Sequence, residues 1–222
     1  MCSSDLCLPL ADVPVQGADA VIGDRAYGTT PDKVAAIAAA VAEGLGAGGV
    51  LPVLKHVPGH GRATADSHLS LPNVTASASE LSTHDFVTFR GLNHAPIAMT
   101  AHVVYEAIDP RRPATVSPRI LHGVVRGEIG FEGLLITDDL SMSALSGALR
   151  ARAKAAFFAG CDIILHCNGK LDEMREIAAE AKVLSGPALA RAEAALGDLH
   201  APIPLDVAAA EARLGEVLGA LA

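Results

Sequence analysis

A run of ionisable residues between Lys55 and His68 holds the side chains of this sequence best suited to proton transfer. It includes Asp66, two positions before His68, and a carboxylate beside an imidazole fixes its tautomer and favours its protonated form. Such an imidazole donates and accepts protons near neutral pH. We expect the two side chains to share a face where the loop is extended. The alternative is a solvated loop in which both are ordinary polar residues.

Two further candidates stand where an apolar run ends. Lys55 and His56 follow the segment Val50–Leu54, and a cation beside an imidazole there is suited to clamping a polyhydroxyl ligand. The alternative for Lys55 is a side chain that snorkels from a strand end to water. The segment Gly59–Gly61 that follows fits a tight turn or an anion-binding nest of backbone N–H groups.

Paired carboxylates follow a third apolar run, Leu134–Thr137. Side chains of neighbouring residues in a strand point to opposite faces, so Asp138 and Asp139 each have a separate task. We interpret Asp138 as the chemical residue at the strand end. Asp139 is then the structural one.

The elements that must position these side chains alternate between strands and helices. The predicted strands are 7–13, 50–54, 96–99, 134–137 and 161–165. The predicted helices are 31–45, 77–93, 117–129, 149–159, 171–184, 187–199 and 207–221. This alternation is typical of an α/β fold with a parallel sheet, closed as a barrel or open. Active sites of such folds lie at the carboxyl ends of the strands, where the candidate residues gather.

Composition excludes several classes of protein. The 222 residues carry 17 Lys and Arg against 25 Asp and Glu, a net charge of −8, which disfavours nucleic acid or an anionic membrane as partner. Half of the residues are hydrophobic, enough for a core, yet no apolar run reaches the length of about 18 residues that a membrane span needs. We find no signal peptide.

The four cysteines form no CxxC motif. Two disulfides are possible, but free thiols in a reducing cytoplasm are the preferred interpretation.

These motifs resemble those of glycoside hydrolase family 3, specifically the bacterial cytoplasmic β-N-acetylhexosaminidases of cell-wall recycling. The resemblance runs from about Leu8 to about Leu184. Its most specific part is the Lys-His-Val-Pro-Gly-His-Gly motif with the Asp-Ser-His loop after it. The matching segments are Lys55–Gly61, Asp66–His68, Ile136–Met142, Val21–Gly28, Pro96–His102 and Gly160–His166.

The resemblance implies a (β/α)₈ barrel of the TIM type and hydrolysis with retention of configuration. Asp138 matches the nucleophile that forms a covalent glycosyl-enzyme, and His68 matches the acid/base, with Asp66 as its partner. This departs from the usual pair of carboxylates. A protonated imidazole nevertheless can donate to the leaving oxygen, and its neutral form can then activate water.

The resemblance also implies a ligand. Arg25, Lys55 and His56 match residues that bind N-acetylglucosamine beside the scissile bond. The expected substrates carry a terminal β-linked N-acetylglucosamine, as in N-acetylglucosaminyl-anhydromuropeptides or chito-oligosaccharides. No metal or organic cofactor, nucleic acid or membrane is implied, and the expected location is the cytoplasm.

The sequence departs from the family at its N-terminus, where the family's first third, with an Asp-Gln-Glu-Gly-Gly motif, has no counterpart. Barrels of this type typically need about 250 residues. We therefore expect five to six β/α units, with 1–7 a leader unlike the family and 8–222 a partial barrel. Open sheet edges would make such a chain fold poorly by itself.

Three alternatives stay open. A metal-dependent barrel hydrolase would draw its ligands from six side chains at strand ends, namely His56, His60, Asp66, His68, His102 and Asp138. A non-catalytic remnant would keep sugar binding through Arg25, Lys55 and His56 alone. Within the family, an uncharged acid/base would also tolerate phosphate in place of water as the acceptor.

Overall fold

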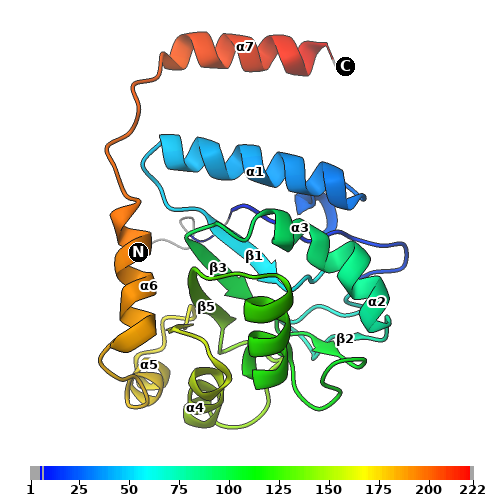
Figure 1. The fold of residues 1–222 in the computed structure, drawn as a ribbon, viewed down its shortest axis with the longest axis vertical. Helices are drawn as coiled ribbons and strands as arrows, with labels where there is room; N and C mark the ends of the chain where they lie inside the picture. The colour runs from blue at the N-terminus through cyan, green and yellow to red at the C-terminus, as the bar shows by residue number, and fades with distance from the viewer. Residues whose placement is uncertain (1–5, 7, 221–222) are drawn as a thin grey trace.

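A computed structural model, which describes residue 6 and residues 8–220, contains a sheet of four parallel strands (Figure 1). In spatial order the strands are β1 (Val53–Val57), β3 (Ile97–Thr100), β5 (Leu134–Asp139) and β6 (Ile163–Leu165). The chain around Leu10 runs parallel to β1, bridged to Lys55. These five segments correspond to the five predicted strands, except that Cys7 lies outside the described residues. The predicted α/β class is confirmed, with an open sheet in the described part of the chain.

Strand β1 lies further along the chain than predicted. Its pairing with β3 continues to Val57, and the backbone of Ala11 donates to the Lys55 carbonyl on the other side. Lys55 and His56 therefore lie inside the strand and are buried, whereas the sequence placed them after it. Parallel pairing on both sides holds the strand extended through these residues, although the run of apolar residues stops before them.

Helices follow the strands as expected. The longer ones are α1 (Pro31–Ala47), α3 (Phe86–Gly91), η5 (Arg119–Glu128), α4 (Leu149–Ala159), α5 (Leu171–Ala178), α6 (Gly186–Gly197) and α7 (Val207–Gly219). One helical stretch leads into α3 through α2 (Ala78–Glu80) and η3 (Leu81–Asp85), and single turns occur at η2 (Gly23–Arg25) and η4 (Ala114–Val116). No helix among the described residues is long and apolar enough to span a membrane.

Local signals account for several helix ends. Ser77 and Glu80 form a capping box, each side chain accepting from the other's backbone N–H. Helix α4 ends where predicted because Gly160 adopts a φ of 116°. Helix α5, by contrast, stops six residues before the predicted end. Beyond it Val183 is 92% exposed, so no packing supports further turns.

A second, unpredicted sheet joins β2 (Asn73–Val74) and β4 (Val104–Tyr105) in parallel. Strands of two residues carry no alternating pattern that a sequence would reveal.

The core lies on both faces of the main sheet because side chains alternate along each strand. One face packs on α1, α3, η5 and α4 through a cluster that includes Leu54, Ala98, Leu135, Ala38, Phe89, Ile120 and Ala156. The opposite face carries Val53, Met99, Leu134 and Ile136, and α6 covers it through Ala195. Helix α7, at the top of Figure 1, has no buried residue.

Candidate active site

Strand β5 presents Asp138 at the carboxyl end of the sheet. Its Oδ1 accepts the Asp139 N–H at 2.8 Å, and its Oδ2 lies 3.9 Å from His56 Nε2. Burial alone would raise the pKa of Asp138, but its electrostatic interactions with the His56 and His102 side chains and the hydrogen bond from the Asp139 N–H outweigh burial and hold that pKa below its usual value. The carboxylate is therefore ionised at neutral pH, as a nucleophile must be.

Asp139 points away from Asp138 and connects two loops. Its Oδ1 accepts from the backbone of Ser141 at 2.9 Å and of Cys167 at 3.2 Å, and its Oδ2 accepts from the Ser141 hydroxyl. These contacts hold the segments after β5 and β6 together. They fit the interpretation of Asp139 as a structural residue.

A buried imidazole contacts the backbone at the end of β5. His102 is fully buried, with Nε2 3.0 Å from the Asp139 carbonyl oxygen and Nδ1 2.7 Å from the Thr115 hydroxyl. Burial lowers its pKa. His102 thus fixes the backbone that carries Asp138.

One carboxylate of the site, Asp12, has no counterpart among the sequence-predicted residues. It is completely buried, and its Oδ2 lies 2.7 Å from His56 Nδ1. Its Oδ1 accepts the His60 N–H at 2.6 Å. We call Asp12 and His56 the buried pair. A signal did exist: a lone carboxylate inside the apolar run Pro9–Val13 needs partners wherever that run is buried.

Gly61 explains how Asp12 comes so near to β1. A Cβ on Gly61 would lie 2.0 Å from the Val13 carbonyl oxygen, so only glycine permits this crossing of two backbone segments. The N–H groups of Gly59 and His60 already donate to His56 O and Asp12. The segment thus forms a tight turn, and two of its three amides are already used within the protein.

His60 is a neutral imidazole at the wall of the site. It is 4% exposed, its ring centroid is 5.7 Å from that of His56, and its Nδ1 has no partner among the described residues. Burial and the neighbouring His56 lower its pKa to about 4.

Asp66 and His68, which we call the exposed pair, contact each other within a single turn. Asp66 Oδ1 accepts the His68 N–H at 2.8 Å and lies 2.7 Å from His68 Nδ1. The contact does not require the extended loop that the spacing suggested as its condition, because the Asp66 carbonyl also accepts the Leu69 N–H and closes a turn. In that turn the carboxylate reaches both donors of the residue two positions on. The His68 backbone N–H, first among several contacts, lowers the pKa of Asp66.

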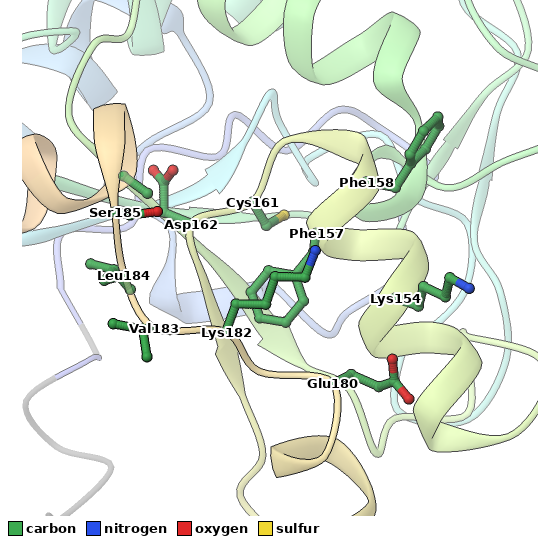
Figure 2. Close-up of a pocket in the computed structure, with 11 residues that line it drawn as sticks. Lys154, Phe157, Phe158, Cys161, Asp162, Glu180, Lys182, Val183, Leu184 and Ser185 are labelled. Atoms are coloured by element: carbon green, nitrogen blue, oxygen red, sulfur yellow. The ribbon is translucent and has the colours of Figure 1, made fainter.

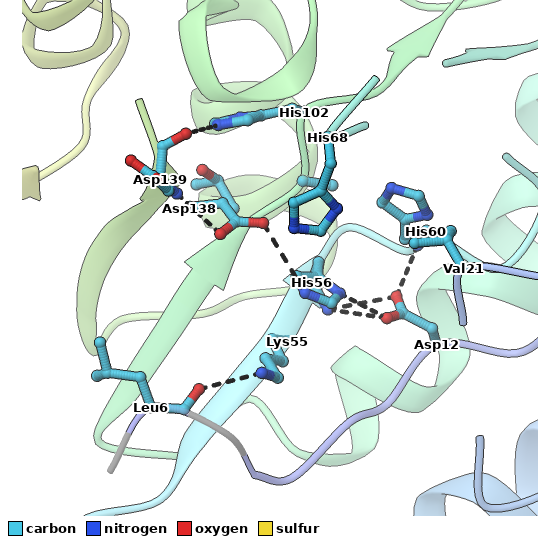
Figure 3. Close-up of polar contacts among 12 residues, drawn as sticks. Leu6, Asp12, Val21, Lys55, His56, His60, His68, His102, Asp138 and Asp139 are labelled. Carbon is cyan, nitrogen blue, oxygen red and sulfur yellow. Dashed lines mark hydrogen bonds and ion pairs between the residues drawn. The ribbon is translucent and has the colours of Figure 1, made fainter. Parts of the chain in front are cut away.

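A cavity of about 210 Å³ brings the predicted residues together. Figure 3 shows how Lys55, His56, His68 and Asp138 lie relative to one another. Five of them line it: Arg25, Lys55, His56, His68 and Asp138. Asp66 is not among the lining residues, but it contacts His68, which is. Lys55 does not snorkel to water, since it is buried and its Nζ donates to the Leu6 carbonyl at 3.1 Å. Arg25, on η2, is exposed at the edge of the cavity.

A larger cavity, of about 420 Å³, lies elsewhere, between α4 and residues 180–188 (Figure 2). Phe157, Val183 and Leu184 give it an apolar wall, and burial raises the pKa of its thiol, Cys161. A protonated, buried thiol is a poor nucleophile. Of these two cavities, the smaller one holds the better candidates for reactive groups.

Neither a metal centre nor a disulfide is found in the described part of the chain. No three His, Cys, Asp or Glu side chains of residues 6 and 8–220 are placed to hold one metal ion. The geometry thus gives the metal-dependent alternative no support. Cys161 and Cys167 are free thiols, as predicted; Cys2 and Cys7 lie outside the described residues.

Comparisons with known proteins agree on one family. Residues 6–195 match the model of the glycosyl hydrolase family 3 N terminal domain. A beta-hexosaminidase of Alkalilimnicola ehrlichii is 46% identical over 157 residues, 69% of this chain and 45% of that protein. A beta-hexosaminidase of Neisseria meningitidis serogroup A is 41% identical over 197 residues, 86% of this chain and 53% of that protein. The chain thus spans about half the length of the curated relatives it matches.

Solved structures show the same fold. NagZ of Neisseria gonorrhoeae, in complex with N-trifluoroacetyl-D-glucosamine, superimposes with a TM-score of 0.75 at 37% identity, covering 84% of this chain and 54% of that one. A glycoside hydrolase family 3 beta-N-acetylglucosaminidase of a Paenibacillus species gives a TM-score of 0.77 at 30% identity, covering 90% of this chain and 41% of that one.

Proposed function

Since the chain belongs to glycoside hydrolase family 3, we propose that its cavity cleaves terminal β-linked N-acetylglucosamine from oligosaccharides with retention of configuration. One observation carries the proposal: an ionised carboxylate, Asp138, and an imidazole paired with a carboxylate, His68, line the same cavity. A nucleophile and an acid/base are the two groups that retaining hydrolysis requires.

In the first step, a carboxylate oxygen of Asp138 attacks the anomeric carbon. The bond from that carbon to the glycosidic oxygen breaks, and protonated His68 gives its Nε2 proton to the departing oxygen. The products are a glycosyl ester of Asp138 and a free sugar alcohol. In the second step, water attacks the anomeric carbon and gives a proton to neutral His68, and the bond to Asp138 breaks.

Asp66 keeps His68 in the form that this cycle needs. A carboxylate only accepts hydrogen bonds, so its contact with Nδ1 keeps a proton on that nitrogen. Nε2 is then the atom that gives and takes the proton. The His68 side chain is 65% exposed, so it is accessible to a leaving group outside the cavity.

We propose that Arg25, Lys55 and His56 bind the N-acetylglucosamine ring. All three line the cavity with Asp138, and their N–H donors suit sugar hydroxyls. The leaving group would extend past the exposed pair into solvent, which suits an anhydromuropeptide or a chito-oligosaccharide. The free thiols Cys161 and Cys167 suit a cytoplasmic setting.

The test is release of 4-nitrophenol from 4-nitrophenyl N-acetyl-β-glucosaminide between about pH 5 and about pH 9. We expect activity that Asp138→Ala abolishes and that Asp172→Ala, a change to an exposed residue of α5, leaves intact. Binding of N-acetylglucosamine without hydrolysis would instead identify a sugar-binding remnant. Activity lost to a chelator and restored by a metal ion would identify the metal-dependent hydrolase.

A further inference from the structure

Asp12 is a carboxylate without access to water, and its hydrogen-bond partners among the described residues all come from one stretch of chain. It is 0% exposed. Besides His56 Nδ1 and the His60 N–H, the His56 N–H lies 3.2 Å and 3.3 Å from its two oxygens. Each of these contacts is to residues 56–60, the end of β1 and the turn after it.

The contact at 2.7 Å determines which nitrogen of His56 carries a proton. An ionised carboxylate has no hydrogen to donate, so the hydrogen between Asp12 Oδ2 and His56 Nδ1 belongs to the imidazole. Burial alone would raise the pKa of Asp12, but its interactions with His56 and His60, including the hydrogen bonds from the His56 ring and the His60 N–H, keep that pKa below its usual value. Nε2 is therefore the nitrogen of His56 that faces Asp138, at 3.9 Å.

The backbone leaves Asp12 little freedom to move. The Ala11 N–H donates to the Lys55 carbonyl at 2.8 Å, and the Ala11 carbonyl accepts from the Thr88 hydroxyl at 2.9 Å. Gly61 allows the chain to cross close to Val13 on the other side. A rigid carboxylate on one nitrogen of an imidazole fixes the direction of the other nitrogen.

We propose that Asp12 is a positioning residue that holds His56 in the Nδ1–H form and directs its Nε2 at Asp138 and the bound sugar. The catalytic part of this inference rests on the proposed function, whereas the tautomer part does not. The site then contains two Asp–His pairs with separate tasks. The exposed pair moves protons, and the buried pair orients a group that touches substrate.

The substitution Asp12→Asn tests the inference because an amide offers one acceptor and one donor. Its oxygen must accept the short His60 N–H contact, which leaves the NH₂ group facing His56 Nδ1. That nitrogen must then lose its proton, and the proton moves to Nε2. A change of charge and a change of tautomer therefore occur together.

The measurement is nitrogen NMR of the whole chain labelled with ¹⁵N-histidine, with His56 identified by the signals that disappear in His56→Gln. We expect a protonated Nδ1 in the wild type and a protonated Nε2 with an unprotonated Nδ1 in Asp12→Asn. We also expect kcat/KM to fall about 10–100-fold, mainly through kcat. An unprotonated Nδ1 in the wild type would overturn the inference, as would an Asp12→Asn variant with unchanged tautomer and rate.

A matched control separates positioning from stability. Asp109 is another buried carboxylate, bonded to the Ser117 hydroxyl at 2.7 Å and absent from the cavity. We expect Asp109→Asn to destabilise the fold but to leave the His56 signals and kcat/KM unchanged. Should Asp12→Asn fail to fold, the wild-type spectrum still decides the tautomer. If the chain shows no hydrolysis, the proposed function fails. The spectra still test whether Asp12 fixes the tautomer of His56.

Discussion

The two Asp–His pairs at the cavity contain the same kind of Asp–His contact but differ in almost everything around it. In both, a carboxylate oxygen lies 2.7 Å from the Nδ1 of the imidazole. In the buried pair the side chains of His56 and Asp12 are 9% and 0% exposed, and in the exposed pair those of His68 and Asp66 are 65% and 29% exposed. A hydrogen-bond length therefore says little about what a pair contributes.

Burial assigns different work to the two pairs. Water competes for each member of the exposed pair, so that pair adds little to stability and its imidazole can exchange protons readily. The buried pair has no such competitor, and removing one member leaves the other without compensation. Rigidity suits orientation of a ligand-binding group, whereas access suits proton transfer to a leaving group and from water.

Within the two pairs, replacement of His68 by alanine should give the largest effect on the reaction. Loss of a positioned acid/base lowers kcat by about 10²–10⁴-fold, whereas an exposed substitution changes the free energy of unfolding by less than about 0.5 kcal/mol. Hydrolysis of a substrate with a poor leaving group and urea unfolding measure the two quantities. A His68→Ala protein that unfolds much more easily, with kcat unchanged, would reverse the roles given to the two pairs.

Replacing each carboxylate by alanine compares how much the two pairs contribute to the free energy of unfolding. Asp12→Ala leaves two backbone N–H groups and the His56 Nδ1–H buried without acceptors, and should cost about 3–5 kcal/mol. Asp66→Ala removes a contact at the surface and should cost about 0.2–1 kcal/mol. Urea unfolding of the two variants at neutral pH measures both.

Two outcomes would contradict the predicted difference in stability between the two variants. Equal losses in the two variants would mean that exposure does not separate the pairs. A loss in Asp66→Ala that approaches that of Asp12→Ala would also contradict the description of the Asp66 turn as a surface feature.

Sequence separation explains which pair the sequence revealed. Asp66 and His68 are two residues apart, so their spacing alone suggested a contact, although not the turn that makes it. Asp12 and His56 are 44 residues apart, and their contact exists only because two strands pair in parallel. A pattern of residue types cannot supply that register.

The same distinction holds for the fold. Alternation of apolar and polar segments predicted the parallel sheet, and a stop signal, Gly160, fixed the end of α4. Asp138 was found because it follows an apolar run, although the strand itself continues through it to Asp139. The position of β1 was wrong by three residues because tertiary pairing kept Lys55 and His56 extended and buried. Burial of charged groups is a property of the assembled sheet, not of the local sequence.

His60, beside the buried pair, should show its effect in the pH dependence of stability. Its folded-state pKa is about 4, against 6.5 for an unperturbed histidine. Between those values the unfolded chain binds the proton and the folded chain does not, so stability falls as pH drops from about 6.5 to about 4. The loss is on the order of 3 kcal/mol. The lowered pKa of Asp12 acts only below about 3.8, outside this window. Urea unfolding across the window should therefore show a steep slope in the wild type and in His68→Asn, and a shallower one in His60→Asn. A slope that persists in His60→Asn and disappears in His68→Asn would contradict this prediction. The pH dependence of stability would then come from the exposed pair and not from the buried His60.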